Sequence, residues 1–362
     1  MSIGIENRRV GGDAPPLIVA ELSGNHNGSL ERALTLVDMA AAAGAHAVKL
    51  QTYTAATMTL NLNRDEFRIN APGHVWHGRT LYGLYEEAHT PWSWHAPLFE
   101  RARRHGLLAF SSPFDDSSVD FLETLDVPCY KIASPENTDL PLIRRAAATG
   151  KPLLISTGMA TGGEIAEAVA AARGAGCTEL VLLKCTSSYP AAPEDSNLHA
   201  IETLRHDFGC DIGLSDHTLG IGAAVAAVAL GAVMIEKHFT LSRADGGVDS
   251  SFSLEPEELR LLVVETARAW AALGTSRIGP TDSEQLPRLY RRSLYITEDL
   301  KAGDVLTRKS LRAIRPGLGL PPKYLEALLG RRLCRDVRRG TPAAWELLLD
   351  ADEKVPLPSR EG

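Results

Sequence analysis

Eight short apolar runs alternate with eight helix-like segments over the first three quarters of the chain, and this alternation constrains the fold more than any other feature. The runs are rich in Val, Ile and Leu, which is typical of strands in a parallel sheet. We predict strands at 17–22, 47–51, 107–111, 129–133, 153–157, 180–184, 212–215 and 233–236. Helices are expected at 30–43, 92–105, 117–125, 140–148, 164–173, 198–207, 222–230 and 256–273.

Eight strands that are each followed by a helix predict an α/β fold, a (β/α)8 TIM barrel. A doubly wound open sheet is the alternative, but the Gly-x-Gly-x-x-Gly turn that it might carry after its first strand is missing. The chain has 362 residues, enough for a barrel and a smaller domain. We expect the barrel at 1–274, a polar linker at 275–290, a small, mostly β domain at 291–350 and a flexible tail at 351–362.

One connection is unusually long, namely the excursion at residues 52–89 between the second strand and its helix. It carries Tyr53, Phe67, Trp76, Tyr82 and Tyr85. Long excursions in compact domains are usually functional, so we interpret it as a lid or substrate loop, with an oligomer contact as the alternative.

Charge is unevenly distributed along the chain. Between Arg288 and Arg339 there are 14 Lys and Arg against 5 Asp and Glu, whereas the whole chain has a net charge of −7. A nucleic-acid-binding tail is one interpretation. We favour a basic module that docks on an acidic body, because the basic residues are interspersed with Leu, Val, Gly and Pro and have few aromatic neighbours.

Neither a membrane segment nor a disulfide framework is expected. No apolar run reaches the roughly 18 residues of a membrane span, and the N-terminus lacks the apolar core of a signal peptide, so a cytoplasmic location is the default. The five cysteines are an odd number without a C-x-x-C pair. We expect them to be free thiols.

Polar residues cluster at the carboxyl ends of the predicted strands, where barrel enzymes place their chemistry. Lys49 and Lys131 lie inside apolar strands, where an unpaired charge is costly. An anion must therefore lie nearby, either a carboxylate such as Glu21 or a bound phosphate or carboxylate group. We favour a bound ligand, because serines lie at neighbouring strand ends and two cations exceed what one carboxylate balances.

Two histidines, His217 and His238, end the last two predicted strands. Neighbouring strand ends would bring both imidazoles together, and imidazole is a common ligand of divalent metals. A structural, hydrogen-bonded histidine at each position is the alternative. Spacing alone leaves the two interpretations equally open.

The motifs at these strand ends resemble those of the sialic acid synthase family, whose members condense phosphoenolpyruvate with an acylamino sugar. The resemblance covers roughly residues 15–349. It is carried by IVAELSGNHNG at 18–28, VKLQT at 48–52, FSSPFD at 110–115, YKIAS at 130–134, ISTGM at 155–159, CTSSYP at 185–190, GLSDHT at 213–218 and EKHFT at 236–240. The stretch from Arg291 resembles the family's antifreeze-like (SAF) domain, which implies a homodimer in which this domain crosses to the partner's barrel.

Within the family the markers ELSGNHN at 21–27, GRTLYGLY at 78–85 and KCT at 184–186 are most similar to pseudaminic acid synthases. This implies condensation of phosphoenolpyruvate with 2,4-diacetamido-2,4,6-trideoxy-L-altrose, with phosphate released by C–O cleavage. Synthesis of N-acetylneuraminate or legionaminate is the alternative, and a non-catalytic sugar- or nucleic-acid-binding protein is a remote one. Two departures from the subfamily are Gly24 in place of Ala and the segment SPEN at 134–137 in place of SFEI.

The resemblance also implies roles for individual residues. His217 and His238 would bind a divalent metal, Mn²⁺ in the first place, with Mg²⁺ or Co²⁺ as alternatives. The expected ligands of phosphoenolpyruvate are Lys49, Ser112, Lys131, Ser134, Ser156 and Ser215. Gln51, Tyr189 and Asp249 would face the sugar, together with Arg315 of the other subunit. Glu21 and Glu136 would handle protons and the attacking water, and neither nucleic acid nor membrane is an expected partner.

Overall fold

The computed structural model describes residues 2–71 and 73–349. The chain forms two compact units, Met1–Gly274 and Thr275–Gly362. The tail predicted at 351–362 lies outside the described residues. Within the described ranges, no helix combines the length and the apolar character needed to cross a membrane.

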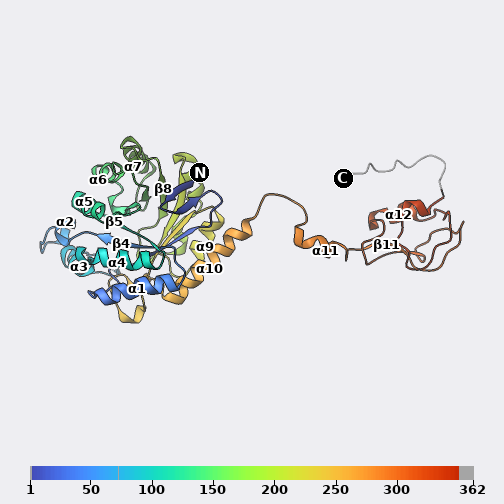
Figure 1. The fold of residues 1–362 in the computed structure, drawn as a ribbon, viewed down its shortest axis with the longest axis horizontal. Coiled ribbons are helices and arrows are strands. Elements are labelled where there is room, and N and C mark those ends of the chain that lie inside the picture. The colour runs from blue at the N-terminus through green and yellow to red at the C-terminus, as the bar shows by residue number, and fades with distance from the viewer. Residues whose placement is uncertain (1, 72, 350–362) are drawn as a thin grey trace. The chain divides into compact units, whose positions relative to one another are not determined.

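The first unit is a closed barrel of eight parallel strands. Helices surround these strands, as Figure 1 shows. The strands are β3 (Leu17–Glu21), β4 (Ala47–Thr52), β5 (Leu108–Pro113), β6 (Tyr130–Ile132), β7 (Leu153–Ser156), β8 (Leu180–Cys185), β9 (Asp211–Asp216) and β10 (Met234–His238). The last strand, β10, pairs with β3 and so closes the barrel. The TIM barrel prediction is confirmed, and the open-sheet alternative is wrong.

A helix follows each barrel strand. These helices are α1 (Leu30–Ala42), α4 (Trp92–Arg104), α5 (Asp116–Thr124), α6 (Leu140–Ala147), α7 (Gly162–Gly174), α8 (Ala200–Phe208), α9 (Gly222–Ala229) and α10 (Pro256–Leu273). The 52–89 excursion adds α2 (Ala55–Met58) and α3 (Leu81–Ala88) between β4 and α4. All five cysteines are free, as expected.

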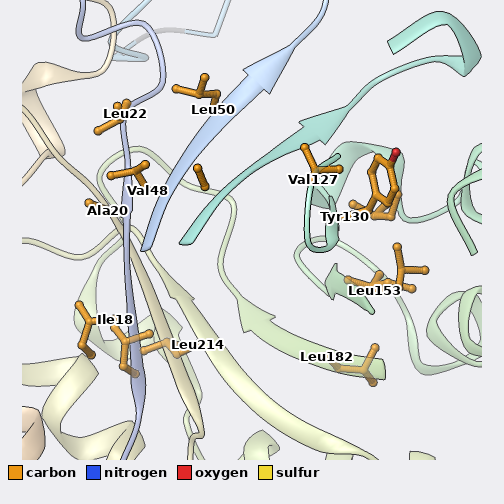
Figure 2. Close-up of a cluster of buried hydrophobic side chains, with 14 of the residues drawn as sticks. Ile18, Ala20, Leu22, Val48, Leu50, Val127, Tyr130, Leu153, Leu182 and Leu214 are labelled. Carbon is orange, nitrogen blue, oxygen red and sulfur yellow. The ribbon is translucent and has the colours of Figure 1, made fainter. Parts of the chain in front are cut away.

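Strand side chains alternate between two apolar cores because successive residues of a strand point to opposite faces. Ile18, Ala20 and Leu22 belong to the large core between the strands and the helices, and Figure 2 shows them along β3. Leu17 and Val19 of the same strand belong to a smaller core inside the barrel. Residue parity along each strand therefore decides which side chains face the barrel interior.

A hairpin of β1 (Ser2–Ile5) and β2 (Arg8–Gly11), which the sequence did not lead us to predict, precedes the barrel. Its residues Ile3, Ile5 and Val10 join the core inside the barrel, together with residues from the amino-terminal halves of the strands. The hairpin thus covers the end of the barrel that is remote from the carboxyl ends of the strands.

The second unit is small and has little regular structure. The short helix α11 (Gln285–Arg288) precedes the antiparallel pair β11 (Ser293–Ile296) and β12 (Leu311–Ile314), and α12 (Leu325–Leu328) follows. Isolated antiparallel bridges such as Leu300 to Val337 extend the β character. Its apolar core includes Leu294, Ile296 and Leu311. A small, mostly β domain after the barrel is thus present.

Candidate active site

The interior of the barrel changes from apolar to polar towards the carboxyl ends of its strands. On β4, Ala47 is followed at inward positions by Lys49 and Gln51, and on β10, Met234 is followed by Glu236 and His238. The inward polar residues are buried or nearly so, and they are Glu21, Lys49, Gln51, Ser112, Lys131, Ser156, Ser215, Glu236 and His238. The predicted barrel residues therefore converge on one site.

Four charged side chains form an ion cluster at the centre of this site. Lys49 pairs with Glu21, and its Nζ lies 3.9 Å from Glu236 Oε2. Lys131 Nζ lies 3.5 Å from Glu236 Oε1, to which Ser215 Oγ donates a hydrogen bond of 3.0 Å. None of the four charged residues is more than 5% exposed.

This cluster corrects the argument that the two lysines need a bound anion. The argument from the sequence set the two lysines against a single carboxylate, Glu21, and did not consider Glu236 as their partner. With Glu236 included, two carboxylates face two lysines, so the internal pairing that we did not favour is present. Glu236 could have been recognised as their partner, because it has the inward parity of its strand and Glu is rarely buried without a partner.

The two carboxylates of the cluster differ in proton affinity. Burial acts to raise the pKa of Glu236, but Lys131 and Lys49 together hold it below its ordinary value. Burial raises the pKa of Glu21, against the opposing effect of Lys49. Glu21 is therefore the carboxylate of the cluster that accepts a proton more readily.

Serine hydroxyls surround the ion cluster. Ser112 Oγ accepts a hydrogen bond of 3.3 Å from Lys49 Nζ, and Ser134 Oγ accepts one of 3.1 Å from the Gly158 amide. Among the described residues, buried Ser156 Oγ has no hydrogen-bond partner. A Cβ at Gly158 would lie only 2.6 Å from Ser134 Oγ, so a larger residue here would displace this hydroxyl. An unpaired hydroxyl and two buried lysines are the donors that a phosphate or carboxylate ligand needs.

The two histidines lie side by side at the ends of β9 and β10, with ring centroids 5.3 Å apart. His217 Nδ1 lies 2.9 Å from the Thr186 carbonyl oxygen, which fixes the ring and leaves Nε2 for another partner. His238 Nδ1 is buried and, within the described chain, has no hydrogen-bond partner. The nearest carboxylate oxygen, Asp249 Oδ2, is 3.8 Å away.

This pair fits a divalent ion that takes its remaining ligands from water or substrate. Burial holds the pKa of His238 well below its ordinary value, so the ring is neutral, the form that binds metals. Burial acts to lower the pKa of His217, but Cys185 and the Thr186 carbonyl raise it above the ordinary value. An ion therefore competes with a proton for His217. In the described residues no cluster of three or more His, Cys, Asp or Glu side chains could hold a metal alone.

A cavity of about 280 Å³ opens beside the histidines. Its polar side is formed by Ser23, Gln51, Glu136, His238 and Asp249. Its other side comes mainly from the 52–89 excursion, which contributes Tyr53, Met58, Ile69, His74, Trp76, Leu81, Leu84, Tyr85 and Ala88. The excursion thus forms a wall of the site, which supports its interpretation as a substrate loop.

Predicted sugar ligands lie in this cavity. Gln51 Nε2 donates hydrogen bonds of 3.2 Å to Glu21 Oε1 and to Ser23 Oγ. Tyr189 lies between Trp76 and His217, with centroid distances of 5.6 and 4.5 Å. The tyrosine thus connects the cavity wall to the histidine pair.

Asp249 is held in place by Asn25, a residue to which the sequence gave no role. Asn25 Nδ2 donates hydrogen bonds to the Phe239 carbonyl, 2.9 Å, and to Ser253 Oγ, 2.8 Å. Ser253 Oγ in turn donates to the Asp249 carbonyl at 2.6 Å, and Ser23 Oγ contacts the Asp249 carboxylate. No spacing rule reveals such a role, because the partners are more than 200 residues away along the chain.

The two departures from the subfamily pattern both lie close to the cavity. Glu136, in the replaced segment, ends a short 3-10 helix (Ser134–Glu136) and lines the cavity. A Cβ at Gly24 would lie 3.1 Å from Ala88 at the end of α3, so glycine allows α3 to approach the loop after β3 closely.

Arg315 belongs to the second unit, where it is exposed in the loop after β12. The first unit by itself therefore does not contain this predicted ligand.

Replacing Glu136 by glutamine should stabilise the protein at alkaline pH. Burial raises the pKa of Glu136 from 4.5 to about 7. A carboxyl with a raised folded-state pKa contributes stability below its unfolded pKa and loses it as pH rises through the folded value. We expect Glu136→Gln to have a higher Tm than the wild type at pH 8 and not at pH 4.5. The gain in the free energy of unfolding at pH 8 should be on the order of 3 kcal/mol at most. Thermal denaturation at both pH values checks this, with the exposed Glu167→Gln as control; a Tm difference that does not change with pH contradicts it.

Comparisons with known proteins agree with this geometry. The model described as NeuB family matches residues 36–277, and the model described as SAF domain matches residues 291–349. A pseudaminic acid synthase of Campylobacter jejuni is 43% identical over 328 residues, which cover 91% of this chain and 95% of that protein. A pseudaminic acid synthase of Helicobacter pylori is 43% identical over 330 residues, which cover 91% of this chain and 96% of that protein. The crystal structure of an N-acetylneuraminic acid synthetase from Leptospira borgpetersenii has a TM-score of 0.71 at 35% identity, covering 79% of this chain and 95% of that one.

Proposed function

The chain belongs to the NeuB family of nonulosonic acid synthases, and we propose that it condenses phosphoenolpyruvate with 2,4-diacetamido-2,4,6-trideoxy-L-altrose to give pseudaminic acid and phosphate. It is an enzyme of the transferase class. The cavity, with polar residues on the barrel side and a largely apolar wall from the excursion, supports a diacetamido-deoxy sugar over N-acetylmannosamine. The choice among the diacetamido sugars rests on the identity of 43% to a pseudaminic acid synthase, against 37% to a legionaminic acid synthase of Legionella pneumophila.

The ion cluster is the proposed site of phosphoenolpyruvate. Lys49, Lys131 and the unpaired Ser156 hydroxyl would receive its phosphate and carboxylate groups, with Ser112, Ser134 and Ser215 nearby. Because the cluster is neutral when both carboxylates are ionised, an entering anion must be accompanied by positive charge. Proton uptake by Glu21, whose pKa is raised, would release Lys49 for the ligand.

The reaction forms one carbon–carbon bond and one carbon–oxygen bond, the latter from water, and breaks the carbon–oxygen bond to the phosphate. The alkene carbon of phosphoenolpyruvate attacks the open-chain aldehyde, and water adds to the cationic carbon that results. A carboxylate takes one proton of that water, and phosphate then leaves with the bridging oxygen while the new hydroxyl loses its proton and becomes the keto group. Glu21 lies within the ion cluster and is suited to the water, whereas Glu136, with a pKa raised to about 7, lies in the cavity and is suited to the aldehyde oxygen. Lys49 and Lys131 would stabilise the departing phosphate.

His217 and His238 would hold a divalent ion, Mn²⁺ in the first place and Mg²⁺ or Co²⁺ as alternatives. When bound, the ion would act as a Lewis acid on the aldehyde carbonyl. The support for this role is the adjacent position of the two rings and the unpaired, buried Nδ1 of neutral His238. His238 lines the cavity, so a sugar bound there would have access to this side of the histidine pair.

The excursion wall favours a sugar with methyl groups. Met58, Ile69, Leu81 and Leu84 present apolar side chains to the cavity. Two acetamido methyls and a deoxy carbon can be buried against such a surface, at about 0.8 kcal/mol per buried methylene-sized group. N-acetylmannosamine carries hydroxyls at two of these positions, and they would lose water there without an evident partner. The alternative, an N-acetylneuraminate synthase, is therefore less well supported.

Phosphate release tests the proposal. Purified enzyme with Mn²⁺ and phosphoenolpyruvate should release phosphate when 2,4-diacetamido-2,4,6-trideoxy-L-altrose is added, and not without it. Removal of divalent ions by EDTA should stop the release, and added Mn²⁺ should restore it. Turnover with N-acetylmannosamine, or with the legionaminate-type stereoisomer alone, would reassign the enzyme to the corresponding synthase.

We expect Arg315 to reach the sugar from the second subunit of a homodimer. The support is the match of residues 291–349 to the SAF domain and the exposed position of Arg315. Replacing Arg315 by alanine should raise the KM for the sugar by about tenfold or more, because a hydrogen bond from a charged donor is lost, and leave the KM for phosphoenolpyruvate nearly unchanged. Steady-state kinetics check this, with exposed Arg312→Ala on β12 as control. A rise in the phosphoenolpyruvate KM alone would remove this role.

A further inference from the structure

A buried ion pair lies directly behind the two histidines. Asp216 Oδ2 and Lys237 Nζ are 2.7 Å apart, and the residues are only 4% and 1% exposed. They are register partners on β9 and β10. Their side chains occupy outward positions of these strands, which otherwise contribute apolar residues such as Leu214 and Ile235 to the core beneath the helices.

The ion pair is linked to the backbone next to both histidines. Asp216 immediately precedes His217, and Lys237 immediately precedes His238. Lys237 Nζ also donates a 2.7 Å hydrogen bond to the Thr218 carbonyl, and the Thr218 amide donates one of 2.9 Å to Asp216 Oδ1. The residues on either side of His217 are therefore tied to the strand that carries His238.

Stability alone does not account for this arrangement. Taking two charges out of water costs several kcal/mol per ion, and apolar replacements of a buried pair are often neutral or stabilising. An outward position beneath the helices would be filled by a Leu or Ile at no such cost. What the ion pair supplies, and an apolar contact does not, is a directional link between two strand ends with a defined separation.

We propose that Asp216 and Lys237 are positioning residues that fix the separation and orientation of the His217 and His238 rings, and thereby the affinity of the site for a divalent ion. The inference rests on the proposed function, because it assumes that the two histidines hold the ion. The pair acts through the backbone, so neither residue needs to contact the ion or the substrates.

The test compares Mn²⁺ affinity with thermal stability in the double variant Asp216→Asn/Lys237→Met. This variant removes both charges together, so that no unpaired charge is left buried, and asparagine can still accept the hydrogen bond from the Thr218 amide. Mn²⁺ binding is measured in the absence of substrates from the electron paramagnetic resonance signal of the free ion. We expect the Kd to rise by about 10–100-fold, the effect typical of residues that orient metal ligands, while Tm changes by only a few degrees.

Leu182→Ala is the matched control. Leu182 is a fully buried, outward-facing residue on β8, so its truncation should lower Tm at least as much and leave the Mn²⁺ Kd unchanged. Wild-type affinity in the double variant, or an equal loss of affinity in Leu182→Ala, would overturn the positioning role. Absence of Mn²⁺ binding in the wild type would instead overturn the proposed metal site itself, and the inference with it.

Discussion

The double variant His217→Ala/His238→Ala should lose at least about a thousandfold in kcat/KM. A Lewis acid contributes several kcal/mol of transition-state stabilisation, and each 1.36 kcal/mol is a factor of ten in rate. The two rings lie at adjacent strand ends with centroids 5.3 Å apart, so the variant removes both proposed protein ligands at once. Steady-state phosphate release and the Mn²⁺ content of the purified protein are the two measurements.

His206→Ala is the control for this variant. His206 is exposed on α8, outside the barrel interior, and its loss should leave both kcat/KM and Mn²⁺ content unchanged. If the double variant is folded and keeps more than about a tenth of the wild-type kcat/KM, the histidines have no role in the reaction.

The second large effect is expected for Lys131→Met. Lys131 is 2% exposed inside the barrel, where its ammonium group lies beside the carboxylate of Glu236. Methionine keeps much of the volume but removes the charge that would meet the phosphate. Loss of one such group costs about 10²–10³ in rate, so kcat/KM for phosphoenolpyruvate should fall by that factor.

Lys184→Met provides a matched lysine control. Lys184 has outward parity on β8 and donates to the Cys185 carbonyl and to Thr186 Oγ1, away from the ion cluster. Its replacement should change kcat/KM for phosphoenolpyruvate by less than about threefold, a difference below 1 kcal/mol. Equal losses in the two variants would show that the interior position of Lys131 has no special importance.

The strand ends could be predicted from the sequence because two regularities coincide. Each strand is an apolar run, and residue parity sends one set of side chains into the barrel. Lys49 and Lys131 were recognisable as interior residues, since a lysine within an apolar run must find a partner. Gly213 also has inward parity on its strand. A Cβ there would lie 2.8 Å from the Met234 carbonyl oxygen, so a side chain does not fit at this position.

Other features depend on contacts between residues far apart in the chain. The pairing of Lys131 with Glu236 joins β6 to β10, and Asn25 holds Asp249 through the Phe239 carbonyl and Ser253. The N-terminal hairpin was missed because its strands have only four residues each, with the polar residues Glu6 and Asn7 between them. Its inward residues become recognisable only when the open end of the barrel is known. Strand parity could have placed Glu236 inside the barrel, but local patterns do not reveal contacts such as those of Asn25.

The most direct test of the account is a competition between sugars. Enzyme with Mn²⁺ and phosphoenolpyruvate is given equal concentrations of 2,4-diacetamido-2,4,6-trideoxy-L-altrose, its legionaminate-type stereoisomer and N-acetylmannosamine, and the products are identified by NMR. The ratio of products equals the ratio of kcat/KM values. We predict that pseudaminic acid is the main product and exceeds N-acetylneuraminate by at least about a hundredfold, the discrimination expected when two hydroxyls must be buried against an apolar wall. Predominance of either other product would contradict the proposed substrate.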